Sequence, residues 1–253
     1  SSDLITTRYD ESDFASSVMA VLHETGHALY ERGLPRDWRN QPVGEARSMS
    51  LHESQSLLME MQACRSAEFF QFAAPLMRDA FDHPGPEAAD VFAPENLHRM
   101  AVHVAPGFIR VDADEVTYPA HVILRFRMER ALLSGDLALK DLPDAWNEEM
   151  GKLLGVTPKN DGEGCLQDIH WYDGAWGYFP TYTLGAMAAA QLFAAANRAH
   201  PEIAKALSKG DFSLLLDWLR KNVHERASFE TTDDVLTRAT GAPLGAHAFK
   251  THL

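Results

Sequence analysis

The sequence is poor in cysteine and in basic residues. Its 253 residues include only 2 cysteines, too few for a disulfide framework, and the spacing between Cys64 and Cys165 matches no zinc-finger or redox motif. Such usage is typical of a reducing compartment, so we expect a cytoplasmic protein. Lys and Arg total 23 against 36 Asp and Glu, a formal net charge of -13. This balance disfavours a nucleic-acid partner, because binding to phosphates needs a basic face.

Long apolar runs are also missing. The chain as given shows neither an 18-residue apolar stretch nor a signal peptide, so we expect it to be neither membrane-spanning nor secreted. We find no internal repeat, low-complexity tract or linker that would divide it. A chain of 253 residues can form one large domain with a substantial core, and we predict a single domain over residues 1–253.

Helical periodicity dominates the sequence. It predicts a first helix that ends after Arg32, and further helices over residues 49–72, 119–133, 142–154, 181–198, 200–208, 211–226 and 232–240. Residues 108–116 alternate between apolar and polar side chains and include β-branched ones, which predicts a short strand or an extended loop. Residues 184–193 are apolar almost all round, as in a buried central helix. The fold is therefore predicted to be mostly α, with one short extended or β segment near the site and a peripheral tail after Gly241.

The strongest functional signal is the stretch His23-Glu24-Thr25-Gly26-His27. Residues i and i+4 share a face of an α-helix, so the two imidazoles can bind one zinc ion, and the Glu24 carboxylate lies close enough to reach a water on that ion. A chain with 12 His and 36 acidic residues could also place this pattern by accident, as a polar patch. Its position on a helix that Asp10 or Ser12 can cap and that stops near Gly33 favours a metal site.

A catalytic zinc ion usually takes three protein ligands and leaves a fourth position for water. Glu53 follows His27 after 25 residues and begins the next helical pattern, so a helix that folds back could bring its carboxylate to the two imidazoles. A Glu near the start of a helix is explained equally well by its favourable interaction with the positive end of the helix macrodipole. Glu31, Glu45 and Glu60 compete with Glu53 for this role, and the residues alone leave the choice open.

Several motifs together resemble the M32 family of metallocarboxypeptidases, the carboxypeptidase Taq type. They occur in the family's order, at Thr6-Thr7-Arg8-Tyr9 with residues 23–31, at His52-Glu53-Ser54-Gln55, at residues 109–115, at residues 164–171 and at residues 177–182. Family members are about twice as long as this chain, and the resemblance implies that it matches their C-terminal catalytic half, either as a naturally short relative or as part of a longer polypeptide. The family's Asp-x-Arg-x-Thr motif aligns with Ser2-Asp3-Leu4-Ile5-Thr6, where only the Thr is kept.

The resemblance implies that His23, His27 and Glu53 are the zinc ligands and that Glu24 is the general base. It further implies a helical, zincin-like fold of the gluzincin kind, a homodimer, and peptide substrates that lose single residues from a free C-terminus. A ligand set of this type suits zinc and tolerates cobalt.

Substrate-binding residues are expected in the later motifs. Arg110 could clamp the substrate carboxylate, although an ordinary ion pair with Asp112 or Asp114 would also explain it. His170 and Tyr182 are our candidates for donors to the oxyanion, by analogy with related zinc peptidases. Tyr178 could contact the substrate terminus. Asp168, in a loop that could also be merely polar, could orient a metal-binding histidine.

Two alternatives from other classes share the same ligands. One is a zinc endopeptidase or aminopeptidase, which needs no carboxylate clamp. The other is a catalytically silent metal-binding remnant. The intact Glu24 argues against the second, because a structural zinc site is normally closed by a fourth protein ligand.

Overall fold

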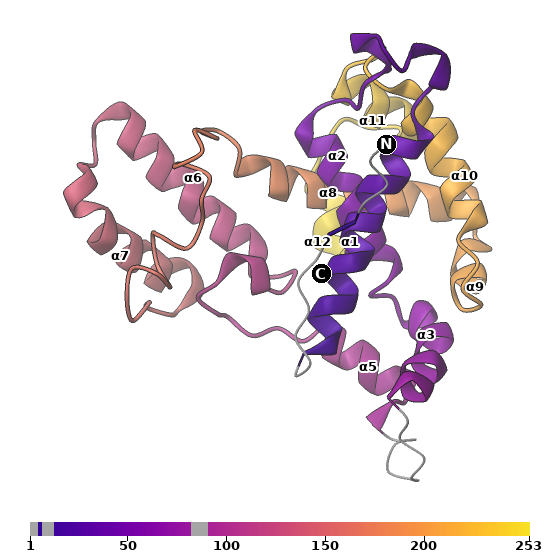
Figure 1. Cartoon of the computed structure of the whole chain (residues 1–253), viewed down its shortest axis with the longest axis horizontal. Coiled ribbons are helices and arrows are strands. Elements are labelled where there is room, and N and C mark those ends of the chain that lie inside the picture. The colour runs from indigo at the N-terminus through magenta and orange to yellow at the C-terminus, as the bar shows by residue number, and fades with distance from the viewer. Residues whose placement is uncertain (1–4, 7–12, 82–90) are drawn as a thin grey trace. The chain divides into compact units, whose positions relative to one another are not determined.

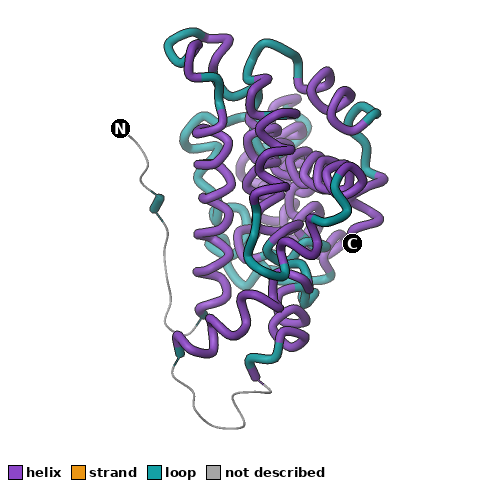
Figure 2. Tube along the Cα trace, turned by 90° about the vertical axis from the view of Figure 1, so that its right-hand side faces the viewer, coloured by secondary structure: helices purple, strands orange, loops and turns teal. Residues whose placement is uncertain are grey.

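Helices joined by loops build the protein (Figure 2). The structure is a computed structural model that describes residues 5–6, 13–81 and 91–253, and no sheet forms among them. The mostly α prediction is confirmed. Of the short strand or extended loop predicted over residues 108–116, no strand forms, and the segment is a loop that contains one turn of 3-10 helix at Arg110–Asp112. None of the helices in these ranges is long and apolar enough to cross a bilayer.

The chain divides into two compact units, which we describe separately. Unit 1 comprises Ser1–Val102 and Leu184–His252, and unit 2 comprises His103–Thr183 with Leu253. The single domain expected from the sequence stays a prediction. Unit 1 contains α1 (Phe14–Gly33), α2 (Met49–Leu57), a π-helix (Leu58–Ala63), α3 (Ala67–Ala80), α5 (Pro94–Ala101), most of α8 (Pro180–Ala199), α9 (Ile203–Leu207), α10 (Ser213–Asn222), α11 (Thr232–Thr240) and α12 (His247–His252), with 3-10 turns at Arg36–Trp38, Pro42–Gly44 and His224–Arg226.

The first helix, α1, lies along α2 (Figure 1). The side chain of Asp13 caps it by accepting a hydrogen bond from the Ser16 N–H at 3.1 Å, whereas the predicted caps Asp10 and Ser12 lie outside the described residues. The helix ends at Gly33, as predicted. Gly26 faces the second helix so closely that a Cβ there would lie 2.4 Å from the Gln55 carbonyl oxygen. A side chain at this position would therefore force α1 and α2 apart.

The long helix predicted over residues 49–72 is broken. It passes from α2 into the π-helix and then starts again at Ala67, where the Ser66 hydroxyl accepts a hydrogen bond from the Phe69 N–H. A π-helix adds a residue to the turn and so re-aims the side chains that follow it. In this protein the π-helix carries Glu60, whose carboxylate contacts His23.

The core of unit 1 gathers around α8, which is buried along most of its length as predicted. The helix α11 has the predicted bounds, with a capping box between Thr231 and Asp234 and a left-handed Gly241 at its end. The peripheral tail predicted after Gly241 is wrong. Residues 247–252 form α12, and its Phe249 is only 6% exposed and packs into the core.

Unit 2 is built on α6 (Tyr118–Ser134) and α7 (Leu142–Leu154), which follow 3-10 turns at Arg110–Asp112 and Leu139–Asp141. Both α-helices end within one residue of their predicted ends, and Gly135 and Gly155, with positive φ angles of 82° and 72°, form their left-handed caps. Leu124 and Trp146 are buried between the two helices. A long loop then leads to the first turn of α8.

His121 on α6 is expected to make the stability of the protein depend on pH. It is fully buried, and neither ring nitrogen has a hydrogen-bond partner among the described residues. Burial, followed by the charges of Arg125 and Arg110, lowers its pKa to about 4. An unfolded histidine titrates near 6.5, so below that pH the unfolded state takes up a proton that the native state refuses. His121 alone should therefore lower the free energy of unfolding by about 1.4 kcal/mol per pH unit as the pH drops from about 6.5 to 4, in addition to the effect of the buried His224, whose pKa is lowered to about 3.

Urea unfolding at several pH values checks this expectation. His121→Leu should make the pH dependence less steep by about 1.4 kcal/mol per pH unit, because it removes one proton-binding group without leaving a polar partner unpaired. His103→Leu, at an exposed position of the same unit, should keep the wild-type slope. Equal slopes for His121→Leu and the wild type would contradict the assignment.

Candidate metal centre

The two motif histidines turn the same ring nitrogen towards one carboxylate. His23 Nε2 lies 3.8 Å from Glu53 Oε1, and His27 Nε2 lies 3.5 Å from Glu53 Oε2. The three side chains offer ligand atoms that all lie within 4.8 Å of one another. The ligands of a tetrahedral zinc ion, each about 2.0–2.1 Å from the metal, are about 3.3 Å apart. The donor set and its spacing therefore fit a metal ion.

The three other carboxylates considered as the third metal ligand make contacts elsewhere. Glu60 accepts a hydrogen bond from His23 Nδ1 at 2.9 Å and pairs with Arg65 at 2.5 Å. Glu31 contacts His52 at 2.8 Å. Glu45 lines a neighbouring pocket. Only Glu53 joins the two histidines in the group of ligand atoms found among the described residues.

Glu60 fixes the orientation of His23. Burial raises the pKa of Glu60, but the hydrogen bond from His23 and the positive charge of Arg65 outweigh it, so the net pKa is lowered and the group is ionised. Burial likewise lowers the pKa of His23, while the hydrogen bond and charge of Glu60 and the charges of Glu53 and Glu24 raise it overall. An ionised Glu60 holds the proton on Nδ1 of the neutral ring, which leaves Nε2 available to a metal.

Glu24 lies beside the two histidines, half-buried on α1. It makes no hydrogen bond or ion pair with any residue that the structure describes. Glu24 and His27 both line a pocket of about 1040 Å³ in unit 1, which also carries Arg32, Arg36 and Arg39. A carboxylate without a fixed partner at the edge of a pocket can exchange protons with water or with a bound molecule.

Gly185 on α8 supports Glu53 from the other side. A Cβ at this position would lie 2.9 Å from both Cβ and Cγ of Glu53, so only a glycine leaves room for the carboxylate-bearing side chain. Sequence reasoning missed this role. The only available signal was a single glycine within the Ala-rich run of a buried helix.

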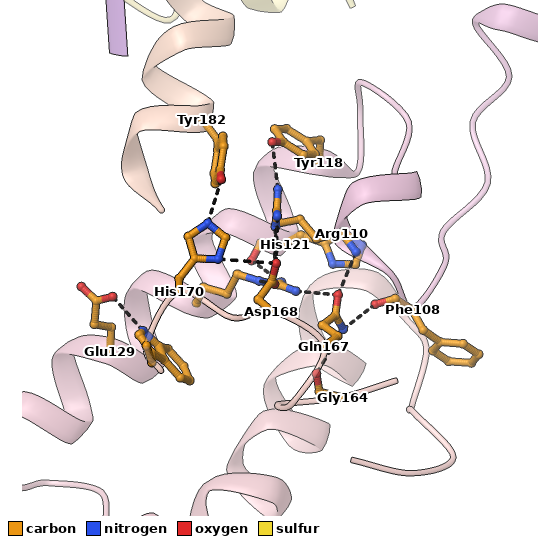
Figure 3. Close-up of polar contacts among 12 residues, drawn as sticks. Phe108, Arg110, Tyr118, His121, Glu129, Gly164, Gln167, Asp168, His170 and Tyr182 are labelled. Carbon is orange, nitrogen blue, oxygen red and sulfur yellow. Dashed lines mark hydrogen bonds and ion pairs between the residues drawn. The ribbon is translucent and has the colours of Figure 1, made fainter. Parts of the chain in front are cut away.

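The catalytic candidates His170 and Tyr182 lie near Arg110 in unit 2 (Figure 3), and Tyr178 belongs to the same unit. His170 Nε2 and the Tyr182 hydroxyl are 2.7 Å apart. The Arg110 guanidinium lies over the Tyr182 ring, 4.5 Å from its centroid, and the Tyr178 ring centroid is 5.6 Å from that of His170. Burial and the positive charges of Arg110 and Arg125 lower the pKa of His170 in spite of the Asp168 carboxylate, so this histidine is neutral near pH 7.

Arg110 pairs with Asp168, rather than with Asp112 or Asp114 as the ordinary ion-pair reading expected. Its Nη2 lies 2.8 Å from Asp168 Oδ1, while Asp114 instead caps the turn before α6 by accepting hydrogen bonds from backbone N–H groups. The expectation that Asp168 orients a metal-binding histidine is wrong. Hydrogen bonds of the Nδ1 atoms of His23 and His27 go to Glu60 and His52.

A second arginine, Arg125, completes this network. It is fully buried on α6, and its Nε lies 2.6 Å from Asp168 Oδ2. Gln167 accepts hydrogen bonds from the Arg110 backbone N–H and from Arg125 Nη2. Burial raises the pKa of Asp168, but the two arginines lower it overall. Two guanidinium groups therefore share one carboxylate, which leaves one net positive charge in this cluster. The sequence gives no signal that separates Arg125 from its exposed neighbours on α6.

The fold and the ligand group are those of a helical metallopeptidase. The family model described as Carboxypeptidase Taq (M32) metallopeptidase matches residues 2–253, and the chain belongs to this family. It is 41% identical to Thermostable carboxypeptidase 1 of Thermus thermophilus and 38% identical to the protein of that name from Pyrococcus furiosus, over 98% and 97% of this chain. The solved structure of Trypanosoma cruzi metallocarboxypeptidase 1 matches 98% of this chain with a TM-score of 0.91 and 43% identity.

The chain spans about half the length of these relatives, namely 48% of both curated proteins and 51% of the solved chain. The predicted resemblance to this family is thereby confirmed, and a match to about half of each relative is consistent with the predicted C-terminal half.

Proposed function

We propose that this chain is the catalytic part of a zinc carboxypeptidase that releases single residues from the free C-terminus of peptides. The observation that carries the proposal is the arrangement of His23, His27 and Glu53, with both Nε2 atoms turned to one carboxylate and Glu24 beside them. Zinc is the metal that best suits two imidazoles and a carboxylate, and cobalt can replace it.

A zinc ion at this site would polarise a peptide carbonyl and lower the pKa of a nearby water. Glu24 is free of other partners among the described residues, so its carboxylate can take a proton from the attacking water and pass it to the leaving amine. His170 Nε2 and the Tyr182 hydroxyl share a hydrogen bond. We assign both side chains to the stabilisation of the oxygen that becomes negative during attack, one as its donor and the other as the partner that holds this donor in place.

The cluster of Arg110, Arg125 and Asp168 supports recognition of the substrate carboxylate. Its one excess positive charge is largely buried, where an unpaired charge is costly, and a bound carboxylate would neutralise it. We assign the contact to Arg110 and place Tyr178 at the substrate terminus. The homodimer implied by the resemblance is also a proposal, and sedimentation velocity tests it.

Release of C-terminal residues tests the proposed function directly. The purified chain is incubated, with zinc, with cobalt or without metal, with a peptide that has a free C-terminus and with its amidated twin. Stepwise release from the free peptide alone supports a carboxypeptidase. Equal cleavage of the amidated twin, or cleavage within the peptide, would instead indicate an endopeptidase or an aminopeptidase. Zinc binding with no hydrolysis would indicate a silent remnant.

Arg110→Gln is expected to lower kcat/KM for free peptides roughly 10- to 100-fold, the range for one lost charge-assisted hydrogen bond in a buried setting. Most of the effect should appear in KM, and Arg110→Lys should restore part of it. Arg39→Gln is the matched control, because Arg39 lines the pocket in unit 1. Loss of affinity in Arg39→Gln but not in Arg110→Gln would move the carboxylate site to that pocket.

A further inference from the structure

We infer that His52 and Glu31 position the proposed metal ligand His27 through a chain of hydrogen bonds. His27 Nδ1 lies 2.6 Å from His52 Nδ1, and His52 Nε2 lies 2.8 Å from Glu31 Oε1. Nothing in the proposed reaction requires His52 to touch the metal or the substrate. The inference rests on the proposed metal centre. It concerns the residues that set the orientation and the tautomer of His27.

For two neutral rings, one arrangement of protons satisfies every contact in this series of hydrogen bonds. If His27 Nε2 is to bind a metal, the proton of its neutral ring must be on Nδ1. That proton is donated to His52 Nδ1, which must then be the acceptor. The proton of His52 is consequently on Nε2, where it is donated to the Glu31 carboxylate.

The reverse arrangement leaves a contact without a proton. With the His27 proton on Nε2, His52 would have to donate from Nδ1, and its bare Nε2 would face the Glu31 carboxylate. Two acceptors at 2.8 Å repel each other, so the negative charge of Glu31 selects the first arrangement. A carboxylate at the far end of the chain thus decides which nitrogen of His27 is open to the metal.

The positions of α1 and α2 fix the three side chains of this hydrogen-bond series. Glu31 follows His27 by one turn of α1, so both point to the same face, and His52 on α2 enters between them. The His52 ring also packs against His27, at 4.6 Å between centroids, and against the fully buried Tyr30, at 5.3 Å. Tyr30 is fixed in turn, since its hydroxyl accepts a hydrogen bond from the Arg47 N–H.

The two proposed imidazole ligands are therefore held differently. His23 is bound directly by Glu60, an ionised carboxylate that also pairs with Arg65. His27 is bound by the imidazole ring of His52, and the carboxylate behind that ring, Glu31, is more than half exposed. Loss of such an outer partner typically lowers metal affinity 10- to 100-fold. We expect His52→Ala to fall in this range and Glu31→Gln to have a smaller effect, because its amide oxygen still accepts the hydrogen bond.

The experiment combines zinc affinity with a direct view of the proton. Zinc Kd is measured by competition with a chelator, and ring ¹⁵N spectra report the tautomer of His27 in the metal-free chain. His52→Asn is the rescue variant, since its amide oxygen can replace Nδ1 as acceptor. Glu230→Gln, which removes a carboxylate paired with Arg238, is the control. We expect wild-type His27 to carry its proton on Nδ1, His52→Ala to lose this preference and bind zinc 10- to 100-fold more weakly, and His52→Asn to recover most of both.

Two outcomes would overturn the inference. One is a His52→Ala variant with wild-type zinc Kd and an unchanged His27 tautomer. The other is equal weakening in His52→Ala and His52→Asn with no change in tautomer, which would make His52 a packing residue. Failure of the wild-type chain to bind zinc would instead overturn the proposed metal centre, and the tautomer measured without metal keeps the two failures distinguishable.

Discussion

Replacing Glu24 by Gln is expected to lower kcat roughly 10²- to 10⁴-fold, the usual contribution of a general base, while zinc stays bound. The carboxylate is half-buried beside His23 and has no hydrogen bond or ion pair with the described residues, so its removal should leave the fold intact. The amide keeps the shape of the side chain but cannot accept a proton from water. Peptide hydrolysis and zinc content are measured on the same preparation.

Glu148→Gln serves as the control for this variant. Glu148 is exposed on α7 and pairs with Lys152, so its loss should change neither hydrolysis nor zinc content. If Glu24→Gln kept wild-type kcat, another base would have to be sought. If it lost zinc together with activity, Glu24 would belong to the ligand set instead.

Gly26→Ala is expected to disrupt the approach of the helix that carries the two histidines to the helix that carries Glu53. The added Cβ would lie 2.4 Å from the Gln55 carbonyl oxygen and 2.6 Å from Ser56 Cα, and backbone atoms cannot rotate away as a side chain could. Overpacking of this kind typically costs about 1–3 kcal/mol of folding stability. The variant should unfold at a lower temperature and bind zinc more weakly, because Glu53 moves away from the imidazoles.

Gly151→Ala is the matched control, since Gly151 also lies inside a helix. A Cβ there would have its nearest neighbour, the Thr157 hydroxyl oxygen, at 3.8 Å, which is ordinary contact. Alanine has the higher helix propensity, so this variant should be slightly stabilised. Thermal unfolding and zinc affinity are compared for the two variants. Similar values for both would show that the close contact of α1 and α2 is not needed.

Local chemistry explains which elements the sequence predicts well. The ends of α6, α7 and α11 are set by Gly135, Gly155 and Gly241, which take left-handed conformations that other residues rarely adopt. The break after Leu57 could not be predicted, because the π-helix depends on how α1 and α8 pack around it. The short helix α12 escaped prediction, since six residues are too few to show a period.

The predicted strand at residues 108–116 shows a different limit. Alternating β-branched residues favour extended backbone, but a strand also needs a neighbouring strand to pair with. No such partner exists among the described residues, so Ile109 stays extended and the chain turns at Arg110.

In the candidate site, too, the spacing of residues within one helix could be predicted, whereas contacts between helices could not. The spacing of His23 and His27 defines a shared helix face, so this pair could be predicted without any structure. Glu53 could not be separated from Glu60 by spacing alone, since both follow on the next helical segment. Their roles differ because the π-helix turns Glu60 towards Nδ1 of His23, while α2 brings Glu53 to the Nε2 atoms.

Anomalous diffraction from crystals of the zinc-loaded chain tests the central claim most directly. We predict one zinc ion about 2.0–2.2 Å from His23 Nε2, His27 Nε2 and a Glu53 oxygen, with a solvent molecule as the remaining ligand. Zinc bound to other side chains, or bound to the histidines through Nδ1 with Glu53 turned away, would contradict the account.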